Sequence, residues 1–314
     1  MRNYTFTMAM LIVVAIALTF PGYFSQWRGF ELKRAIIPLL QVIMLGMGST
    51  LSLRDFESVL RQPRSVIIGL ACQFTIMPLL GCTLAHLFAF PSEVAAGVIL
   101  VGCVPCGLAS NVMSYIARAN VPLSITIVAL ATLVAPLLTP LLMRILGSTY
   151  VQIDFWKMTR DMLEIVVLPI VFGLILNRLL RRHQEFLKAW MPRLSMTAIL
   201  IIASIVTAAG QKQLLAVGWL LPVCVLLHNL LGYCLGYWSA RALGMSPCDA
   251  RTVAIEVGLQ NTGLASGLAF GMGKVATVGL APALFGPLMN VTGSLLAVHW
   301  GRNPPPSTST SSNV

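Results

Sequence analysis

Residues 104–111 read VPCGLASN, and residues 256–263 read EVGLQNTG. Each stretch places polar side chains and proline or glycine inside a long apolar run. Because proline lacks a backbone N–H and glycine relaxes the backbone, a helix that enters either stretch is expected to break there. In hydrocarbon, the backbone groups freed by a break must be buried in protein or line a cavity. The two stretches therefore predict two interrupted membrane helices with a polar site at the breaks.

The rest of the chain has the composition of a membrane protein. Its 314 residues are 57% hydrophobic and only 10% charged, whereas soluble domains carry about 25% charged residues. A membrane crossing needs about 20 mostly apolar residues. Such runs occur at about 6–24, 35–52, 65–87, 94–116, 122–146, 158–179, 194–210, 214–240, 250–270 and 277–299. They fill nearly the whole chain, which excludes a nucleotide-hydrolysing module, so any pumping must draw on an ion gradient.

These spans predict an all-α membrane protein with ten transmembrane helices. We expect one membrane domain over residues 1–300 and a disordered tail over 301–314, which is rich in Pro, Ser and Thr. Ten spans divide into two sets of five, about 1–147 and 155–300. An odd number of spans per set makes the second set enter the membrane in the opposite sense, which is the inverted-repeat arrangement of many secondary transporters. The interrupted fourth and ninth spans occupy matching places in the two sets.

The formal charge of +11 indicates topology rather than a nucleic-acid partner. The basic residues lie in short connections between apolar runs and do not gather into one patch. Five of them cluster between the sixth and seventh spans: Arg178, Arg181, Arg182, Lys188 and Arg193. The positive-inside rule marks that connection as cytoplasmic and, by counting spans, places both termini on the same side.

Oxygen-bearing side chains gather at both breaks. Glu256 is the only carboxylate near the middle of a predicted span, and an ionisable group there costs at least about 2.5 kcal/mol. A cation is therefore its natural partner. Gln260 follows four residues later, on the same helical face, and Asn261 stands beside the break, while Ser110 and Asn111 supply similar oxygens at the other break. Such oxygen shells favour sodium over a transition metal, and a proton on Glu256 is the rival coupling ion.

Three other spans contain buried polar residues. Gln73 in the third span either completes a cation shell or bridges helices, because a buried amide needs partners. A lone histidine such as His228 in the eighth span more often forms a hydrogen bond in the core than binds a ligand. Asn290 and Thr292 in the tenth span are placed to approach the same cavity.

Four segments together resemble a known family. They read GLASNVMSY at 107–115, LS at 123–124, IEVGLQNTGL at 255–264 and NVTGSLL at 290–296. Over almost the full chain the sequence resembles the bile acid:sodium symporter family, particularly its bacterial members. The resemblance implies a panel of spans 1, 2, 6 and 7 and a core of spans 3, 4, 5, 8, 9 and 10, with discontinuous spans 4 and 9 crossing at their breaks. It also implies a multi-pass protein of a bacterial inner membrane.

The same resemblance implies where the ions and the substrate bind. The first sodium site would comprise Ser110, Asn111, Ser124 and Glu256. The second would comprise Gln73, Glu256, Val257, Leu259 and Gln260, with backbone carbonyls contributing. The substrate would lie at Gly107, Leu108, Ala109, Asn261, Thr262, Gly263 and Asn290. Sodium is the only metal expected, and we expect no cofactor beyond these coupling ions.

The chain departs from the family pattern at three places. Val128 stands four residues after Ser124, where the family usually has a hydroxyl, so the first sodium site should be weaker or filled by water. Leu108 replaces a threonine common in bacterial relatives, and Leu-Met at 288–289 replaces a tryptophan–histidine pair. The substrate is therefore expected to be more apolar, or to be held more through backbone amides, than in those relatives.

The sequence thus predicts sodium-coupled symport of an organic anion by alternating access. The expected cargo is a small carboxylate such as pantoate or ketopantoate, or a bile-acid-like molecule. A proton-coupled carrier that uses Glu256 as its proton site is the alternative. An intramembrane enzyme would need a nucleophile with a base or a metal cluster, and the sequence contains no such pattern, so we expect no enzyme. Beyond the lipid bilayer, sodium and the anion, no obligate protein partner is evident.

Overall fold

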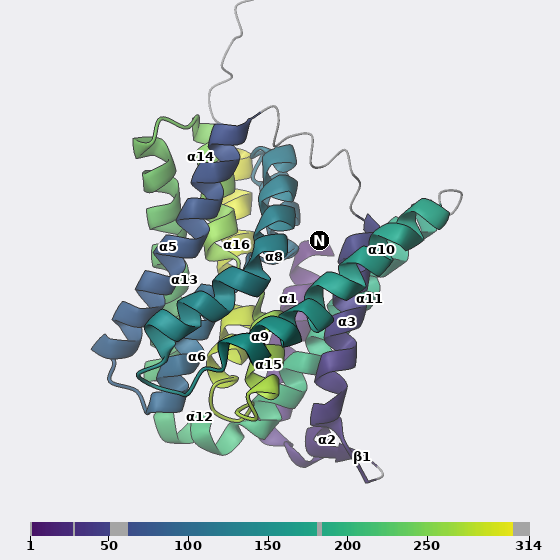
Figure 1. The fold of residues 1–314 in the computed structure, drawn as a ribbon, viewed down its shortest axis with the longest axis vertical. Helices are drawn as coiled ribbons and strands as arrows, with labels where there is room; N and C mark the ends of the chain where they lie inside the picture. The colour runs from purple at the N-terminus through teal and green to yellow at the C-terminus, as the bar shows by residue number, and fades with distance from the viewer. Residues whose placement is uncertain (1, 28, 51–61, 181–183, 304–314) are drawn as a thin grey trace, which may run out of the picture.

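The structure is a computed structural model of the chain and describes residues 2–27, 29–50, 62–180 and 184–303. It is mostly helical (Figure 1). The first half contains α1 (Arg2–Thr19), α2 (Gly22–Ser25), η1 (Leu32–Ala35), α3 (Ile36–Thr50), α5 (Pro63–Leu87), α6 (Ser92–Cys103), α7 (Ala109–Ile116), α8 (Val121–Leu142) and η3 (Met143–Gly147). Two short strands, β1 (Gln26–Trp27) and β2 (Phe30–Glu31), pair antiparallel. The second half contains α9 (Phe155–Met162), η4 (Leu163–Val167), α10 (Leu168–Leu179), α11 (Gln184–Ala209), α12 (Gln211–Val217), α13 (Leu220–Ala242), α14 (Pro247–Gly258), α15 (Thr262–Gly271) and α16 (Leu280–Arg302).

Seven helical runs in the described part of the chain are long and apolar enough to cross a membrane. They are Leu32–Thr50, Pro63–Leu87, Val121–Gly147, Phe155–Leu179, Glu185–Ala209, Leu220–Ala242 and Leu280–Arg302. Many large apolar side chains point outward, as Ile67, Leu137 and Phe172 do with 65%, 60% and 61% of their surface exposed. Lipid accommodates such a surface, whereas water does not. The protein is therefore a multi-pass membrane protein.

The two predicted interruptions are confirmed. The fourth predicted span consists of α6 and α7, which are separated by residues 104–108. The ninth consists of α14 and α15, which are separated by residues 259–261. Each half-helix is too short to cross a bilayer by itself, since a crossing needs about 20 residues.

Two predicted spans begin elsewhere than expected. The seventh was predicted from residue 194, but α11 begins at Gln184, because residues 185–191 are mostly good helix formers that continue the helix beyond its apolar part. The eighth was predicted from residue 214, but Gly218 adopts a left-handed φ of 65° and separates α12 from α13. Helix α16 continues through Arg302, into the predicted tail. Residues 304–314 of that tail and residues 181–183 of the basic cluster lie outside the described residues.

Polar side chains cap the starts of several helices and so define where these helices begin. Asn120 accepts a hydrogen bond from the backbone N–H of residue 123 at the start of α8. Asp154, Ser246 and Asn261 accept equivalent bonds at the starts of α9, α14 and α15. Each cap satisfies an amide that the helix leaves without a partner.

The described helices pack as two groups. In one group, α3 packs against α10 and α11, and α1 packs against α11. The other group contains α5, α6, α7, α8, α13, α14 and α16. The groups meet through α15, which contacts α3, α9 and α11, through α16, which contacts α1 and α11, and through α8, which packs against α9. In Figure 1, α10 and α11 run toward the upper right, away from α5 and α14.

Candidate functional site at the crossing of the broken helices

The two breaks lie against each other at the middle of the second helix group. The backbone N–H of Gly107 donates to the carbonyl of Leu259 over 2.9 Å, and the N–H of Asn261 donates to the carbonyl of Pro105 over 2.9 Å. Backbone groups freed by one break are therefore satisfied by the other. A Cβ atom at Gly107 would lie only 3.1 Å from the carbonyl oxygen of Gln260, so glycine permits this close crossing.

The four side chains predicted for the first sodium site meet beside this crossing. Ser110 of α7, Ser124 of α8 and Glu256 of α14 are all fully buried. Ser110 Oγ donates to Glu256 Oε2 over 2.8 Å, and Ser124 Oγ donates to the other carboxylate oxygen. Ser124 Oγ also lies 2.8 Å from Asn111 Oδ1. We call Ser110, Asn111, Ser124 and Glu256 the carboxylate cluster.

The carboxylate cluster contains more acceptors than hydrogens. A serine hydroxyl carries one hydrogen, yet Ser110 Oγ lies 2.8 Å from both Gly107 O and Glu256 Oε2. Ser124 Oγ likewise faces both Asn111 Oδ1 and the carboxylate. Cys106 adds only a thiol, which is a weak donor, to Glu256. Among the described residues, no Lys or Arg forms an ion pair with this carboxylate. Asn111 can donate to Ser124 Oγ if its amide is turned, so what the cluster lacks is a positive charge.

Two buried amides form a second cluster at the crossing. Gln73 Nε2 donates to the carbonyl of Val104 over 3.1 Å and to Gln260 Oε1 over 2.9 Å. Gln260 Nε2 donates to the carbonyl of Val257 over 2.5 Å. Gln73 therefore bridges helices and also faces the carbonyls of both breaks. We call Gln73, Gln260 and these two carbonyls the amide cluster; the carbonyl of Leu259, also predicted as a ligand, accepts the Gly107 bond instead.

The expectation that Gln260 shares a helical face with Glu256 was wrong. It assumed helical spacing from Glu256 to Gln260, but α14 ends at Gly258, so the helix does not continue that far. Glu256 bonds within the carboxylate cluster, and Gln260 bonds within the amide cluster. Asn261 Oδ1 accepts from the backbone N–H of Leu264 and caps α15.

The predicted substrate residues surround the same crossing. Four of them are partly exposed: Leu108, Ala109, Asn261 and Gly263. Three are buried: Gly107, Thr262 and Asn290. Helix α7 begins without a side-chain cap, and the amides of Ser110 and Asn111 donate to the carbonyls of Gly107 and Leu108 instead. The amide nitrogen of Asn290 donates to a carbonyl of its own helix, that of Gly286, over 2.7 Å.

The departures from the family pattern lie close to these clusters. Val128 is buried on α8 one helical turn beyond Ser124 and offers no side-chain oxygen. Thr126 donates to the carbonyl of Pro122 on its own helix over 2.8 Å. His228 bonds to the carbonyl of Met77 over 3.0 Å, which agrees with the core role expected for it.

Comparison with known proteins identifies the family. The model of the sodium bile acid symporter family matches residues 37–217, more than half of the chain. The chain belongs to the sodium bile acid symporter family. It is 36% identical over 299 residues to the uncharacterized sodium-dependent transporter YocS of Bacillus subtilis (strain 168), covering 95% of this chain and 91% of that protein. It is 34% identical over 266 residues to the probable chloroplastic sodium/metabolite cotransporter BASS1 of Arabidopsis thaliana, covering 85% of this chain and 66% of that protein.

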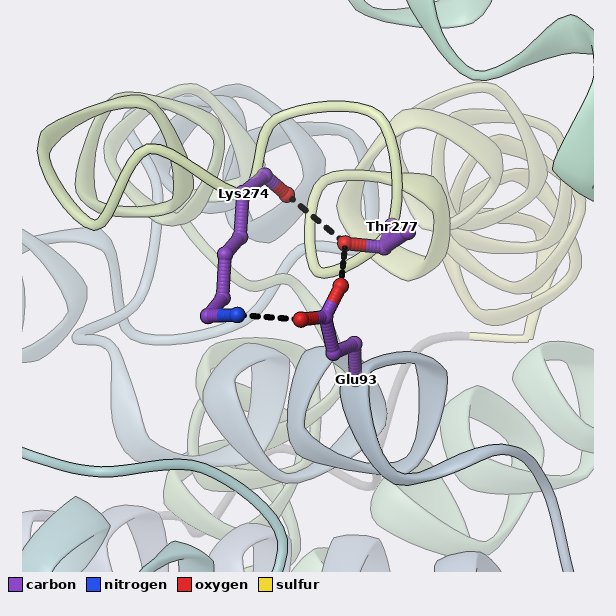
Figure 2. A network of polar contacts seen from close by, with 3 residues as sticks. All are labelled: Glu93, Lys274 and Thr277. Atoms are coloured by element: carbon purple, nitrogen blue, oxygen red, sulfur yellow. Dashed lines mark hydrogen bonds and ion pairs between the residues drawn. The ribbon is translucent and has the colours of Figure 1, made fainter.

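A polar network that the sequence did not predict lies at the far ends of the broken spans (Figure 2). Glu93, in the first turn of α6, forms an ion pair with Lys274 and accepts a 2.6 Å hydrogen bond from Thr277 Oγ1. The network ties the turn between α15 and α16 to the start of α6. Nearby, Lys157 Nζ of α9 donates to the carbonyl of Gly271 over 3.1 Å, beside a cavity of about 130 Å³. The partners of each contact lie more than 100 residues apart, so no local pattern reveals them.

Proposed function

We propose that this family member is a sodium-coupled symporter that carries an organic anion across a bacterial inner membrane. The observation that carries the proposal is the carboxylate cluster, in which the buried Glu256 is surrounded by hydroxyl and amide groups and, among the described residues, forms no ion pair with a Lys or Arg. A hard monovalent cation prefers such an oxygen shell. The printed names of the relatives, a sodium-dependent transporter and a sodium/metabolite cotransporter, support the same ion.

We assign the first sodium ion to the carboxylate cluster and the second to the amide cluster with Glu256 and Leu259. A terminal amide can turn by 180° and exchange its nitrogen for its oxygen without repacking its surroundings, since the two ends have nearly the same size. Turning the amide of Gln260 would point Oε1 at the carbonyl of Val257, and a cation between the two oxygens would relieve that contact. Sodium would therefore replace the hydrogen bonds that the two glutamines make in this structure.

The anion would bind at the amino ends of α7 and α15. Both half-helices begin at the crossing, so the positive ends of two helix dipoles meet there. We propose that the anion contacts the residues at these starts: Gly107, Leu108, Ala109, Asn261, Thr262 and Gly263, with Asn290 beside them. The apolar Leu108 and the Leu-Met pair at 288–289 favour a cargo with an apolar body and one carboxylate. Small carboxylates such as pantoate or ketopantoate, and bile-acid-like molecules, fit this description.

We further propose ten spans in two inverted repeats, with both termini cytoplasmic. The reciprocal backbone bonds between the breaks support a two-fold relation between the repeats. The two helix groups match the panel and the core, since α1, α3, α10 and α11 pack together. Because the panel meets the core through α8, α15 and α16 rather than through α7 and α14, rocking on these contacts would open and close the crossing to the two sides.

A thermal-shift screen of the purified protein tests the proposal. Small 2-oxo and 2-hydroxy acids and bile acids would each be added in sodium or in potassium. We expect at least one acid to stabilise the protein more strongly in sodium, because ion and anion binding are coupled. Equal stabilisation by that acid in both salts would refute sodium coupling. Uptake in sodium-free buffer under a pH gradient would then test Glu256 as a proton site, the alternative mechanism.

A further inference from the structure

The end of α14 is held by a chain of hydrogen bonds that crosses three helices. Asn229 of α13 is fully buried, and its Nδ2 donates to the carbonyl of Gly258 over 2.8 Å. Its Oδ1 accepts from Thr292 Oγ1 of α16 over 2.5 Å. The carbonyl of Gly258 is among those left without a helical partner where α14 stops. Asn229 therefore satisfies it, and Thr292 orients Asn229.

An aromatic ring confines the same peptide from another side. A Cβ atom at Gly258 would lie 2.1 Å from Cε1 of Tyr233, so the ring packs directly on the backbone. The hydroxyl of Tyr233 lies 3.3 Å from the carbonyl oxygen of Met289 and 3.5 Å from Thr292 Oγ1, so its contacts are long. The ring thus supplies packing, whereas Asn229 supplies the hydrogen bond that orients the carbonyl.

The other break has a matching support. Gln73 of α5 donates to the carbonyl of Val104, the residue after the end of α6, and Thr139 of α8 donates to the carbonyl of Cys103 over 2.7 Å. In both halves an amide from one neighbouring helix and a hydroxyl from another thus support the end of the broken helix. The amide of Gln73 also reaches Gln260, whereas Asn229 uses both ends of its amide in the support.

We infer that Asn229, oriented by Thr292, is a positioning residue for the second sodium site. The inference rests on the proposed function. The peptide that Asn229 holds lies between Val257 and Leu259, whose carbonyls are proposed ligands, so its orientation sets where both oxygens point. Without the bond, a buried carbonyl is left unsatisfied and the break shifts to other conformations. The apparent sodium affinity then falls in proportion to the population of the ligating conformation.

Sodium titration of thermal stability tests the inference on the purified full chain, with potassium chloride keeping the ionic strength constant. We expect Asn229→Leu, which keeps the number and branching of the side-chain heavy atoms, to raise the half-saturating sodium concentration by about tenfold. Thr292→Val should raise it by about threefold, because Asn229 then loses its orienting donor. Thr292→Ser keeps the hydroxyl and should restore the wild-type value. Thr83→Val is the matched control, because it makes the same chemical change on the exposed face of α5, where Thr83 donates to the carbonyl of Leu79 on its own helix, and it should titrate like the wild type.

The outcomes separate the inference from the proposed function. If sodium does not stabilise the wild type more than potassium does, the proposed function fails and the inference fails with it. If the wild type responds and both Asn229→Leu and Thr292→Val titrate like it, only the inference is wrong, even if both variants melt at lower temperature. If Asn229→Leu does not elute as a single species in size-exclusion chromatography, the comparison of Thr292→Val with Thr292→Ser tests the inference instead.

Discussion

Replacing Glu256 by glutamine keeps the shape of the side chain and removes its charge. The hydrogen bonds of the carboxylate cluster can rearrange to fit the new amide. Its oxygen accepts from Ser110, and its nitrogen donates to Ser124 Oγ, whose own hydrogen then goes to Asn111 Oδ1 at 2.8 Å. No buried polar atom of these side chains loses its partner, so Glu256→Gln should fold and purify like the wild type.

Sodium binding, by contrast, should be lost in Glu256→Gln. The attraction between a carboxylate and a cation about 4 Å apart is about 4 kcal/mol at an effective dielectric constant of about 20. Since each 1.4 kcal/mol changes an affinity tenfold, the half-saturating sodium concentration should rise by roughly 1,000-fold. Both proposed sodium sites include Glu256, so neither should respond to sodium within a usable salt range.

The assay is the melting temperature of the purified variant in increasing sodium chloride, compared with potassium chloride. Glu93→Gln is the matched control, because it makes the same chemical change at the far end of α6, in the network of Figure 2. We expect the control to keep the full sodium response. A Glu256→Gln protein that titrates within about threefold of the wild type would refute the assignment of sodium to the carboxylate cluster.

Three further substitutions probe the crossing by the same titration. Val128→Thr adds a hydroxyl to a buried position one turn beyond Ser124 and should lower the half-saturating sodium concentration by about threefold or more. An unchanged value would show that position 128 does not contribute to the first sodium site. Gln73→Leu removes one amide of the amide cluster and should reduce the sodium cooperativity of the titration toward that of a single ion; unchanged cooperativity would contradict the second site. Gly107→Val places a branched side chain about 3.1 Å from the Gln260 carbonyl oxygen, and overpacking of this kind costs about 1–3 kcal/mol. The melting temperature should fall and the sodium response should disappear; a variant that keeps both would show that the tight crossing is not required.

Much of the fold could be read from local properties of the sequence. Hydropathy depends on about 20 neighbouring residues, and proline and glycine act on their own turn of helix. The membrane class therefore followed from the apolar runs along the chain, and the two breaks followed from residues 104–111 and 256–263. The high cost of a carboxylate inside a membrane singled out Glu256 in the same way.

The resemblance to the family carried the prediction further than local properties could. It grouped Ser124 with Ser110, Asn111 and Glu256 before any contact was known, and the structure brings the four side chains together. That these oxygens hold sodium stays a prediction. Helical spacing, used without the resemblance, wrongly placed Gln260 on the same helical face as Glu256, because α14 ends at Gly258, where the partner break lies against it.

The sequence by itself determined that the chain spans a membrane, that two of its helices break, and that a carboxylate is buried near one break. Only the tertiary structure decided which groups face that carboxylate and which groups support the breaks. Glu256 and Ser110 lie 146 residues apart, and Glu93 and Lys274 lie 181 apart, so only the packing of whole helices brings them into contact. Asn229 shows the physical reason most clearly: a buried asparagine must find partners, but its sequence neighbours do not reveal that its partner is the carbonyl of Gly258.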